Sequence, residues 1–132
     1  MTQESKSGVA YVDTSCLVSV ALGERGASAL DRRLSTFGEL VSSNLLEAEL
    51  RATLTREGVV LDPGFLADIS WVLPARPLSA EIERVVAAGY IRGADCWHLA
   101  VALYIADDPA EITFVTLDNK QREVARLLGF RT

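Results

Sequence analysis

Short β-prone runs alternate with helical patterns along the chain, and this alternation restricts the fold more than any other feature of the sequence. The first run, Val9 to Val12, is apolar and passes directly into Asp-Thr-Ser, residues that favour the start of a helix. Because a helix is predicted after each strand, consecutive strands should lie parallel, with the helices crossing over the sheet between them. Further strands are predicted at Leu40 to Ser42, Ser70 to Leu73 and Ile112 to Thr116, with an edge strand at Phe130.

Helical patterns fill the segments between these strands. Helices are predicted directly after Asp13, and over Glu24 to Phe37, Asn44 to Arg56, Ser79 to Tyr90, Ala94 to Ala106 and Gln121 to Leu128. Helices that alternate with parallel strands cover both faces of the sheet. The sequence therefore predicts an α/β fold, a three-layer α/β/α sandwich with a central parallel sheet of four to five strands.

The length and composition indicate one globular domain. A chain of 132 residues can enclose a hydrophobic core, and 49% hydrophobic and 23% charged residues are typical of globular proteins. Residues 1–8 are polar and are predicted to be a flexible tail, which leaves 9–132 as the single domain. No segment has the roughly 18 to 20 uninterrupted apolar residues that a membrane span needs, so we expect a cytoplasmic protein without membrane contact.

The cysteines and the net charge exclude two common kinds of site. Cys16, Cys96 and the only histidine, His98, do not form a ligand set for structural zinc, so both thiols are expected to be buried and reduced. The formal net charge of -5 argues against a broad basic face that holds nucleic acid. A nuclease can tolerate this charge if cations bound in an acidic pocket contact the phosphate, because the cations reverse the local sign of charge.

Two of the predicted strands end at an aspartate. Asp13 follows the first strand, and Asp118 follows the strand that begins at Ile112. Ligands collect at the carboxyl ends of the strands in open parallel sheets, so both side chains should reach the same edge of the sheet. Each aspartate can instead be the N-cap of the helix that follows it, and the sequence alone leaves both interpretations open.

Asp95 is the only acidic residue in the predicted helix Ala94 to Ala106, which is apolar on nearly all sides. Burying a carboxylate on such a helix is unfavourable by several kcal/mol unless the group is capped, paired or bound to a cation. Its position in the first turn is favoured by the helix dipole, by about 0.3 to 1 kcal/mol. This gain is small beside the desolvation penalty, so a bound cation is the preferred interpretation and capping is the alternative.

The helix predicted from Asn44 carries a second candidate acid, Glu49. Leu45 and Ala52 lie at i−4 and i+3 from Glu49, so this carboxylate should share a helix face with buried residues, whereas Glu47 projects elsewhere. The alternative is that Glu49 forms a surface ion pair with an arginine such as Arg51.

Four carboxylates gathered at one sheet edge repel one another unless cations lie between them. Hard oxygen ligands of this kind suit Mg²⁺ or Mn²⁺ rather than zinc. Paired ions can activate a water molecule and stabilise the leaving oxygen in phosphodiester hydrolysis. The acidic residues are therefore typical of a metal-dependent nuclease.

Four sequence motifs, in this order, resemble those of one known family. YVDTS, SSNLLEAEL, RGADCWHLAVAL and FVTLDNKQREVARLLGF look like the motifs of a PIN domain of the VapC toxin type, and they span about residues 9–130. In that family an Asp ends the first strand, a Glu follows a Ser by six residues, an Asp precedes a His-Leu-Ala helix, and an Asp follows Thr-x. The matching positions are Asp13, Glu49 (counted from Ser43), Asp95 and Asp118. Gln121 stands where some relatives have a further acid, so the sequence leaves open whether a second metal site is occupied.

The resemblance implies an activity and two partners. A PIN domain of this type is expected to be a Mg²⁺- or Mn²⁺-dependent endoribonuclease that cleaves tRNA, ribosomal RNA or messenger RNA. As the toxin of a toxin-antitoxin pair, it would be a homodimer inhibited by a cognate small antitoxin protein whose C-terminal segment enters the active groove. A housekeeping RNA-processing nuclease and a non-catalytic PIN-like binding module are the alternatives.

Further polar residues neighbour these acids in the sequence. Ser15 and Thr116 can orient a carboxylate or a metal-bound water, and helix capping and strand packing explain them equally well. His98 is expected to be a buried or supporting histidine rather than a general base. Basic residues that can contact RNA phosphates, each also explained by ordinary surface charge, are Arg51, Arg92, Lys120 and Arg122.

A response-regulator receiver domain is the competing interpretation from another class of protein. Receiver domains are also small acidic α/β sandwiches with a Mg²⁺ pocket, but they need a phosphorylatable Asp after the third strand and a Lys at the end of a late strand. Here the third predicted strand runs into Leu73 and Pro74, and the only lysines are Lys6 and Lys120. A receiver domain also gives no role to Glu49.

Overall fold

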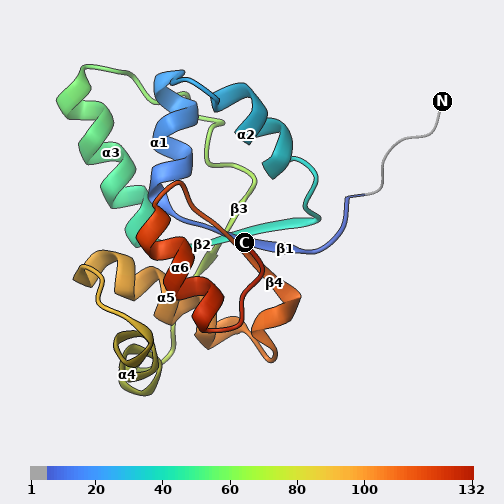
Figure 1. The fold of residues 1–132 in the computed structure, drawn as a ribbon. Helices are drawn as coiled ribbons and strands as arrows, with labels where there is room; N and C mark the ends of the chain where they lie inside the picture. The colour runs from blue at the N-terminus through green and yellow to red at the C-terminus, as the bar shows by residue number, and fades with distance from the viewer. Residues whose placement is uncertain (1–5) are drawn as a thin grey trace.

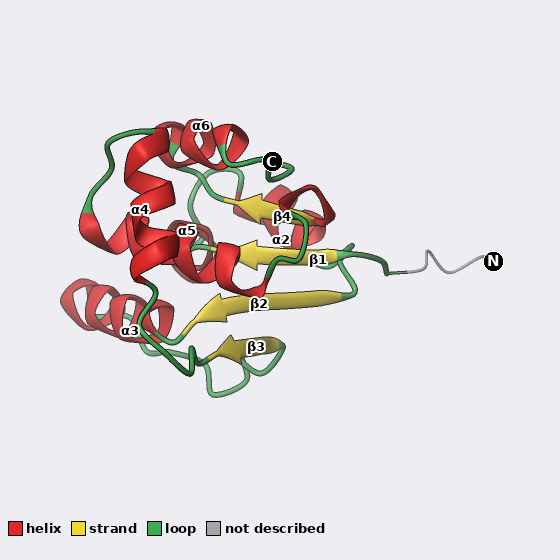
Figure 2. Cartoon of the chain, turned by 90° about the horizontal axis from the view of Figure 1, so that it is seen from below, coloured by secondary structure: helices red, strands yellow, loops and turns green. Residues whose placement is uncertain are grey.

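The computed structural model describes residues 6–132, which form a parallel sheet covered by helices (Figure 1). The strands are β1 (Val9–Val12), β2 (Glu39–Ser43), β3 (Ile69–Val72) and β4 (Ile112–Val115). Their order is β3-β2-β1-β4 and every pairing is parallel, so all four arrows in Figure 2 point the same way. The carboxyl ends of the strands therefore meet at one edge of the sheet.

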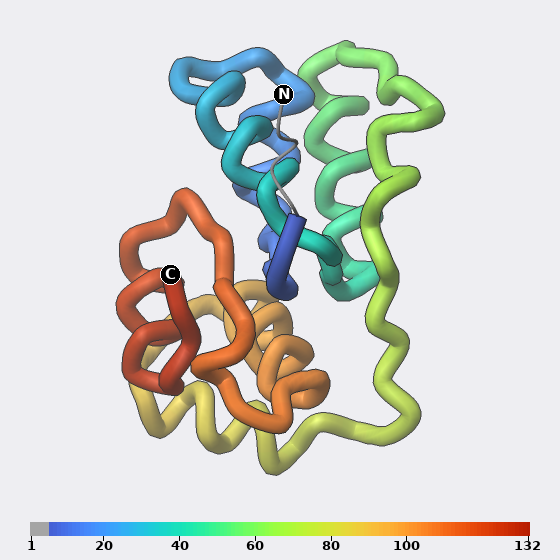
Figure 3. The backbone as a smooth tube through the Cα atoms, turned by 90° about the vertical axis from the view of Figure 1, so that its right-hand side faces the viewer, coloured from blue at the N-terminus to red at the C-terminus, as the bar shows by residue number. Residues whose placement is uncertain are grey.

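Helices cover both faces of this sheet. One group is α1 (Thr14–Leu22), α2 (Ala27–Leu34) and α3 (Leu45–Glu57), and the other is α4 (Ser79–Ala88), α5 (Gly93–Ile105) and α6 (Asn119–Leu127). Figure 3 shows the two groups on opposite sides of the strands. A 3-10 turn, Pro109–Glu111, leads into β4. The predicted three-layer α/β/α architecture is confirmed.

The central strand β1 contributes to a core on each face. Tyr11 packs in the cluster that includes α4, α5 and α6, whereas Ala10 and Val12 pack with α1 and α3. This alternation follows from the period of two in a strand, and all three side chains are fully buried because both faces are covered. The uniformly apolar sequence of β1 is therefore explained by its position in the middle of the sheet.

Two predicted elements differ from the structure. The helix expected over residues 24–37 is shorter, because Gly23 and Gly26 adopt φ angles of 63° and 85° and form the turn between α1 and α2. The fifth strand expected at Phe130 is only an isolated bridge between Thr113 and Arg131. The sheet therefore has the lower of the two predicted strand numbers.

Three further expectations concern the N-terminal tail, a membrane span and the two cysteines. Of the predicted tail at 1–8, residues 1–5 lie outside the described residues, whereas the amide of Ser7 donates to the carbonyl of Thr36, with an N–O distance of 3.2 Å. Within residues 6–132, no helix combines the length and the apolar character that crossing a membrane requires. Cys16 and Cys96 are both buried and free, as expected.

Candidate active site

Asp13 follows β1 directly and is held at the carboxyl edge of the sheet. Val12 pairs with Val115, so Asp13 and Thr116 are the first residues beyond two neighbouring strands. Ser15 Oγ donates to Asp13 Oδ1, and Thr116 Oγ1 donates to Oδ2, each across 2.7 Å. Burial raises the pKa of this carboxyl, and the two hydroxyl donors oppose that rise. Asp13 occupies the N-cap position of α1, but its side chain makes no capping hydrogen bond.

Asp118 lies beyond the end of β4 and does cap the helix that follows it. Its Oδ1 accepts the amide of Gln121 across 3.0 Å, and its own amide donates to Thr116 Oγ1 across 3.0 Å. The capping interpretation therefore accounts for one carboxylate oxygen of Asp118, while the side chain stays exposed at the start of α6.

Gln121 is fully buried beneath this turn. Its Nε2 donates to the carbonyl of Asp95 across 3.2 Å, and its Oε1 lies 3.1 Å from Thr116 Oγ1. These contacts tie α6 to the first turn of α5. The amide side chain of Gln121 therefore joins two helices, where an aspartate or glutamate would have added a fifth acid to the site.

Asp95 lies in the first turn of α5, half-buried, and no group of residues 6–132 donates a hydrogen bond to its carboxylate. Burial is the largest cause of the raised pKa of Asp95. The charges of Asp118, Asp13 and Glu49 raise it further. All four predicted acids thus contribute to one electrostatic environment, and among the described residues Asp95 is the member whose carboxylate accepts no hydrogen bond.

Glu49 reaches this environment from α3. Its Oε1 accepts hydrogen bonds from Thr14 Oγ1 across 2.8 Å and from His98 Nε2 across 3.0 Å. The bond from His98 is the largest cause of the lowered pKa of Glu49. The alternative partner, Arg51, instead forms an ion pair with Glu47, with an N–O distance of 2.8 Å.

The helix face that we expected to carry Glu49 inward was wrong. Ala52 is exposed and Leu45 only half-buried, and the residues of α3 that enter the core are Leu46, Leu50 and Leu54. Glu49 lies beside that face because Leu46 is three positions before it. Its position follows from the contacts with Thr14 and His98, not from the periodicity that we used.

His98 connects Glu49 to the interior of the protein. The residue is 1% exposed, and its Nδ1 lies 2.7 Å from the hydroxyl of Tyr11. That hydroxyl accepts the amide of Ser43, the last residue of β2, across 3.1 Å. Tyr11, Thr14 and Ser43 were missing from the residues predicted for the site, although Thr14 and Tyr11 are immediate sequence neighbours of the Val12–Asp13 pair.

Carboxylate oxygens are the kind of donor that Mg²⁺ and Mn²⁺ require, and Asp95 has both oxygens free of protein hydrogen bonds within residues 6–132. Within the same residues, no three His, Cys, Asp or Glu side chains lie close enough together to enclose an ion as they stand. The donor set therefore fits a hard divalent cation in kind. Closing around one requires rotation of side chains or bridging water molecules.

A cavity of about 330 Å³ opens beside two of the acids. Its lining combines carboxylates, cationic side chains and an exposed aromatic ring: Tyr90, Ile91, Arg92, Asp95, Asp118 and Lys120. Two of the four predicted RNA-contacting cations therefore lie at this cavity. The other two make contacts with protein groups instead: Arg51 forms an ion pair with Glu47, and Arg122 donates a hydrogen bond to the carbonyl of Thr116.

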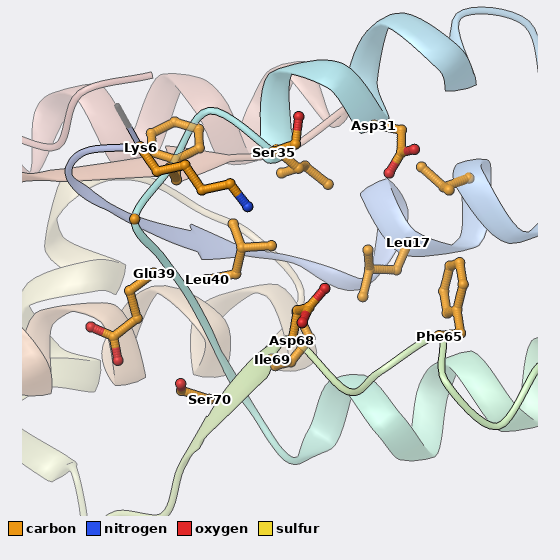
Figure 4. A pocket seen from close by; sticks show the side chains of 14 residues that line it. Lys6, Leu17, Asp31, Ser35, Glu39, Leu40, Phe65, Asp68, Ile69 and Ser70 are labelled. Atoms are coloured by element: carbon orange, nitrogen blue, oxygen red, sulfur yellow. The ribbon is translucent and has the colours of Figure 1, made fainter. Parts of the chain in front are cut away.

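Two other hollows lie away from the four acids. Figure 4 shows one of about 340 Å³ near the start of β2 and β3, lined by side chains that include Leu17, Asp31 and Phe65. Another of about 390 Å³ is lined by residues from the sheet and from the end of α5, among them Trp71 and Ile105. None of the four predicted acids lines either hollow, so the acidic edge is separate from both.

Comparison with protein families decides what kind of domain this is. The family model of the PIN domain matches residues 10–127. The chain is a PIN domain. PIN domains form a nuclease family that generally uses divalent metal ions. No curated protein sequence matches the chain.

Membership of the PIN family gives the acidic edge its context. The matched range includes all four acids, together with Thr14, Ser15, Tyr11 and His98. A nuclease must bring a phosphodiester close to groups that stabilise charge, and this edge of the PIN domain combines carboxylates with Arg92 and Lys120.

Proposed function

We propose that this PIN domain is a Mg²⁺- or Mn²⁺-dependent endoribonuclease that acts as the toxin of a toxin-antitoxin pair. The observation that supports the nuclease activity most strongly is the gathering of the acids at one edge, because Asp95 and Asp118 line the same cavity and the charges of Asp118, Asp13 and Glu49 act on Asp95. Carboxylates that repel one another in this way gain stability from a divalent cation. Ions held by these acids would activate a water molecule and stabilise the leaving oxygen of the phosphodiester.

The residues of the site divide into carboxylates and the groups that orient them. Ser15 and Thr116 hold Asp13 with one hydrogen bond on each oxygen. Thr14 and His98 hold Glu49. These donors fix the carboxylates before a substrate arrives, which reduces the reorganisation that binding requires.

Arg92 and Lys120 are placed to bind the phosphates of RNA. Both line the cavity that Asp95 and Asp118 also line. Lys120 makes one weak ion pair, with an N–O distance of 3.8 Å to Glu123, and both cationic side chains are exposed. Two cations do not make a broad basic face, so the chain relies on bound metal ions for much of its contact with phosphate.

The test of the nuclease activity is cleavage of total RNA by the purified protein. We expect cleavage with Mn²⁺ or Mg²⁺ and none in excess EDTA, and Asp95→Asn is the control against a contaminating nuclease. Mn²⁺ should also raise the melting temperature, because an ion that binds only the folded state stabilises that state. Full cleavage in excess EDTA would contradict the proposed mechanism.

The toxin role needs a separate test in living bacteria. Expression of the parent protein should arrest growth, and expression of Asp95→Asn at the same level should not. A small protein encoded beside this gene should relieve the arrest by binding at the acidic edge, using basic side chains that complement it. Active, soluble enzyme that leaves growth unchanged would indicate a housekeeping role in RNA processing. Sedimentation of the purified protein tests the proposed homodimer.

A further inference from the structure

A buried chain of hydrogen bonds connects the backbone of β2 to Glu49. The amide of Ser43 donates to the hydroxyl of Tyr11 across 3.1 Å. That hydroxyl lies 2.7 Å from His98 Nδ1, and His98 Nε2 lies 3.0 Å from Glu49 Oε1. Tyr11 and His98 are 0% and 1% exposed, so water does not compete for the contacts of the Tyr11 hydroxyl.

The direction of each hydrogen bond follows from the groups involved. A backbone amide can only donate, so the oxygen of Tyr11 accepts from Ser43. The phenol hydroxyl has one proton to donate, and its other hydrogen-bond partner within residues 6–132 is His98 Nδ1. Nδ1 must then be unprotonated. The N–H of the ring then lies on Nε2, which donates to Glu49.

The two rings in this series of hydrogen bonds, those of Tyr11 and His98, have little freedom to rotate. Tyr11 stacks on Phe114 with centroids 5.2 Å apart and planes 5° from parallel. It also meets His98 edge-on, with centroids 5.7 Å apart and an interplanar angle of 69°. Close packing of this kind restricts each ring to one rotamer. The N–H of His98 is therefore aimed at Glu49 by both packing and hydrogen bonding.

Glu49 receives its two hydrogen bonds on the same oxygen. Thr14 Oγ1 and His98 Nε2 both donate to Oε1, and no group of residues 6–132 donates to Oε2. The Glu49 side chain is 34% exposed. One oxygen is thus anchored by the protein while the other is left for a ligand from outside. Asp13 differs, because each of its oxygens accepts a hydroxyl.

We propose that Tyr11 and His98 are positioning residues for Glu49. Tyr11 sets the tautomer of His98, and His98 holds Oε1 so that Oε2 is presented to a divalent cation at the acidic edge. The presentation to a cation rests on the proposed function, whereas the tautomer does not. Neither residue touches the substrate, and their effect on cleavage passes through Glu49.

The tautomer can be measured directly because His98 is the only histidine of the chain. We would label the imidazole nitrogens with ¹⁵N in a chain without a histidine tag and record their NMR signals near neutral pH. The expected result is a neutral ring with the proton on Nε2, and a mixture of tautomers in Tyr11→Phe. A parent ring protonated on Nδ1, or on both nitrogens, would overturn the proposal.

Kinetics then separate positioning from general stability. Tyr11→Phe should lower kcat about 10- to 100-fold, as the loss of an outer hydrogen-bonding partner does at metal sites, with the KM for RNA unchanged. Tyr104→Phe is the matched control. It also removes a hydroxyl that accepts a backbone amide, here the amide of Ala75, and Tyr104 lies near the end of α5, whereas Asp95 lies at its start. Rates are measured where thermal unfolding shows each variant to be folded. An unchanged kcat in folded Tyr11→Phe would overturn the proposal.

His98 variants provide a second route if Tyr11→Phe does not fold. His98→Gln can supply an amide N–H near the place of Nε2, whereas His98→Leu cannot, so the Gln variant should retain more activity and bind Mn²⁺ more tightly in a calorimetric titration. Equal loss in both variants would contradict the positioning role. A parent protein that neither binds Mn²⁺ nor cleaves RNA would refute the proposed function, and the imidazole spectrum would still decide the hydrogen-bond chain.

Discussion

Asp95→Asn tests whether the acidic edge is built for a ligand or for stability. The substitution keeps the shape of the side chain and removes its charge. It breaks no hydrogen bond to the carboxylate within residues 6–132, since none is present there. In the absence of metal, the variant should be at least as stable as the parent, because burial and three neighbouring acids disfavour the charged form.

The size of this effect follows from competing contributions. Asp95 is half-buried, so solvent screens its repulsion from the other acids, and relief of that repulsion should stabilise the variant by up to about 1 kcal/mol. Loss of the favourable helix-dipole interaction offsets about 0.3 kcal/mol or more of this gain. For a domain of this size, 1 kcal/mol corresponds to roughly 3 °C in Tm.

The pH dependence provides an internal control. The pKa of Asp95 is raised in the fold, so its ionisation destabilises the parent, and that loss develops as pH rises through the raised pKa. At pH values below the ordinary range of an aspartate, the carboxyl is protonated in both states, and the stability difference between parent and variant should disappear.

The assay is urea unfolding in EDTA at several pH values, repeated with Mn²⁺. Mn²⁺ should stabilise the parent more than the variant, because the variant lacks one anionic ligand. A variant destabilised by more than about 1 kcal/mol in EDTA at neutral pH would show that Asp95 has a mainly structural role, as the loss of a cap does.

Three further predictions concern other parts of the site. Glu49→Gln should abolish most RNA cleavage in the folded protein. Glu47→Gln should retain most of the cleavage and change the free energy of unfolding by no more than about 0.5 kcal/mol, as for a surface site. Cleavage rates of the two variants and the parent are compared at saturating Mn²⁺. Thr116→Val should destabilise the protein by about 1 to 3 kcal/mol in urea unfolding, because the buried Asp13 carboxylate loses a donor. Replacing Arg92 and Lys120 by alanine should weaken RNA binding in Ca²⁺ and flatten its salt dependence, measured by fluorescence anisotropy, whereas unchanged binding would place the RNA elsewhere.

The fold could be predicted in detail where one local pattern was enough. The run from Val9 to Val12 is apolar at every position, as expected of a strand buried on both faces, and it is a strand over those residues. The helix boundary near Glu24 was less accessible, because it depends on the positive φ of Gly26. Glycine permits that conformation but does not require it, so the composition of the segment could not reveal the turn.

The helix that carries Glu49 shows a different limit. Its sequence has apolar side chains in more than one helical phase, and periodicity alone did not distinguish the face of Leu45 and Ala52 from the face of Leu46 and Leu50. The structure buries the second face, since Leu46 and Leu50 pack against residues of α1 and β1. The resemblance pointed to Glu49 by motif spacing, which does not depend on the helical phase.

The contacts that orient the acids were the least predictable part, because each joins segments that only the fold brings together. Tyr11 and His98 are 87 positions apart, and His98 and Glu49 are 49 apart. In the sequence, Tyr11 looks like one more large residue of a buried strand, and its ring does pack in the core. Its hydroxyl needs a partner in that position, as a buried polar group generally does. A tyrosine in the otherwise aliphatic strand before the first aspartate is therefore a usable signal. It indicates that the fold must supply a buried hydrogen-bond acceptor for the hydroxyl, and in this structure that acceptor is His98.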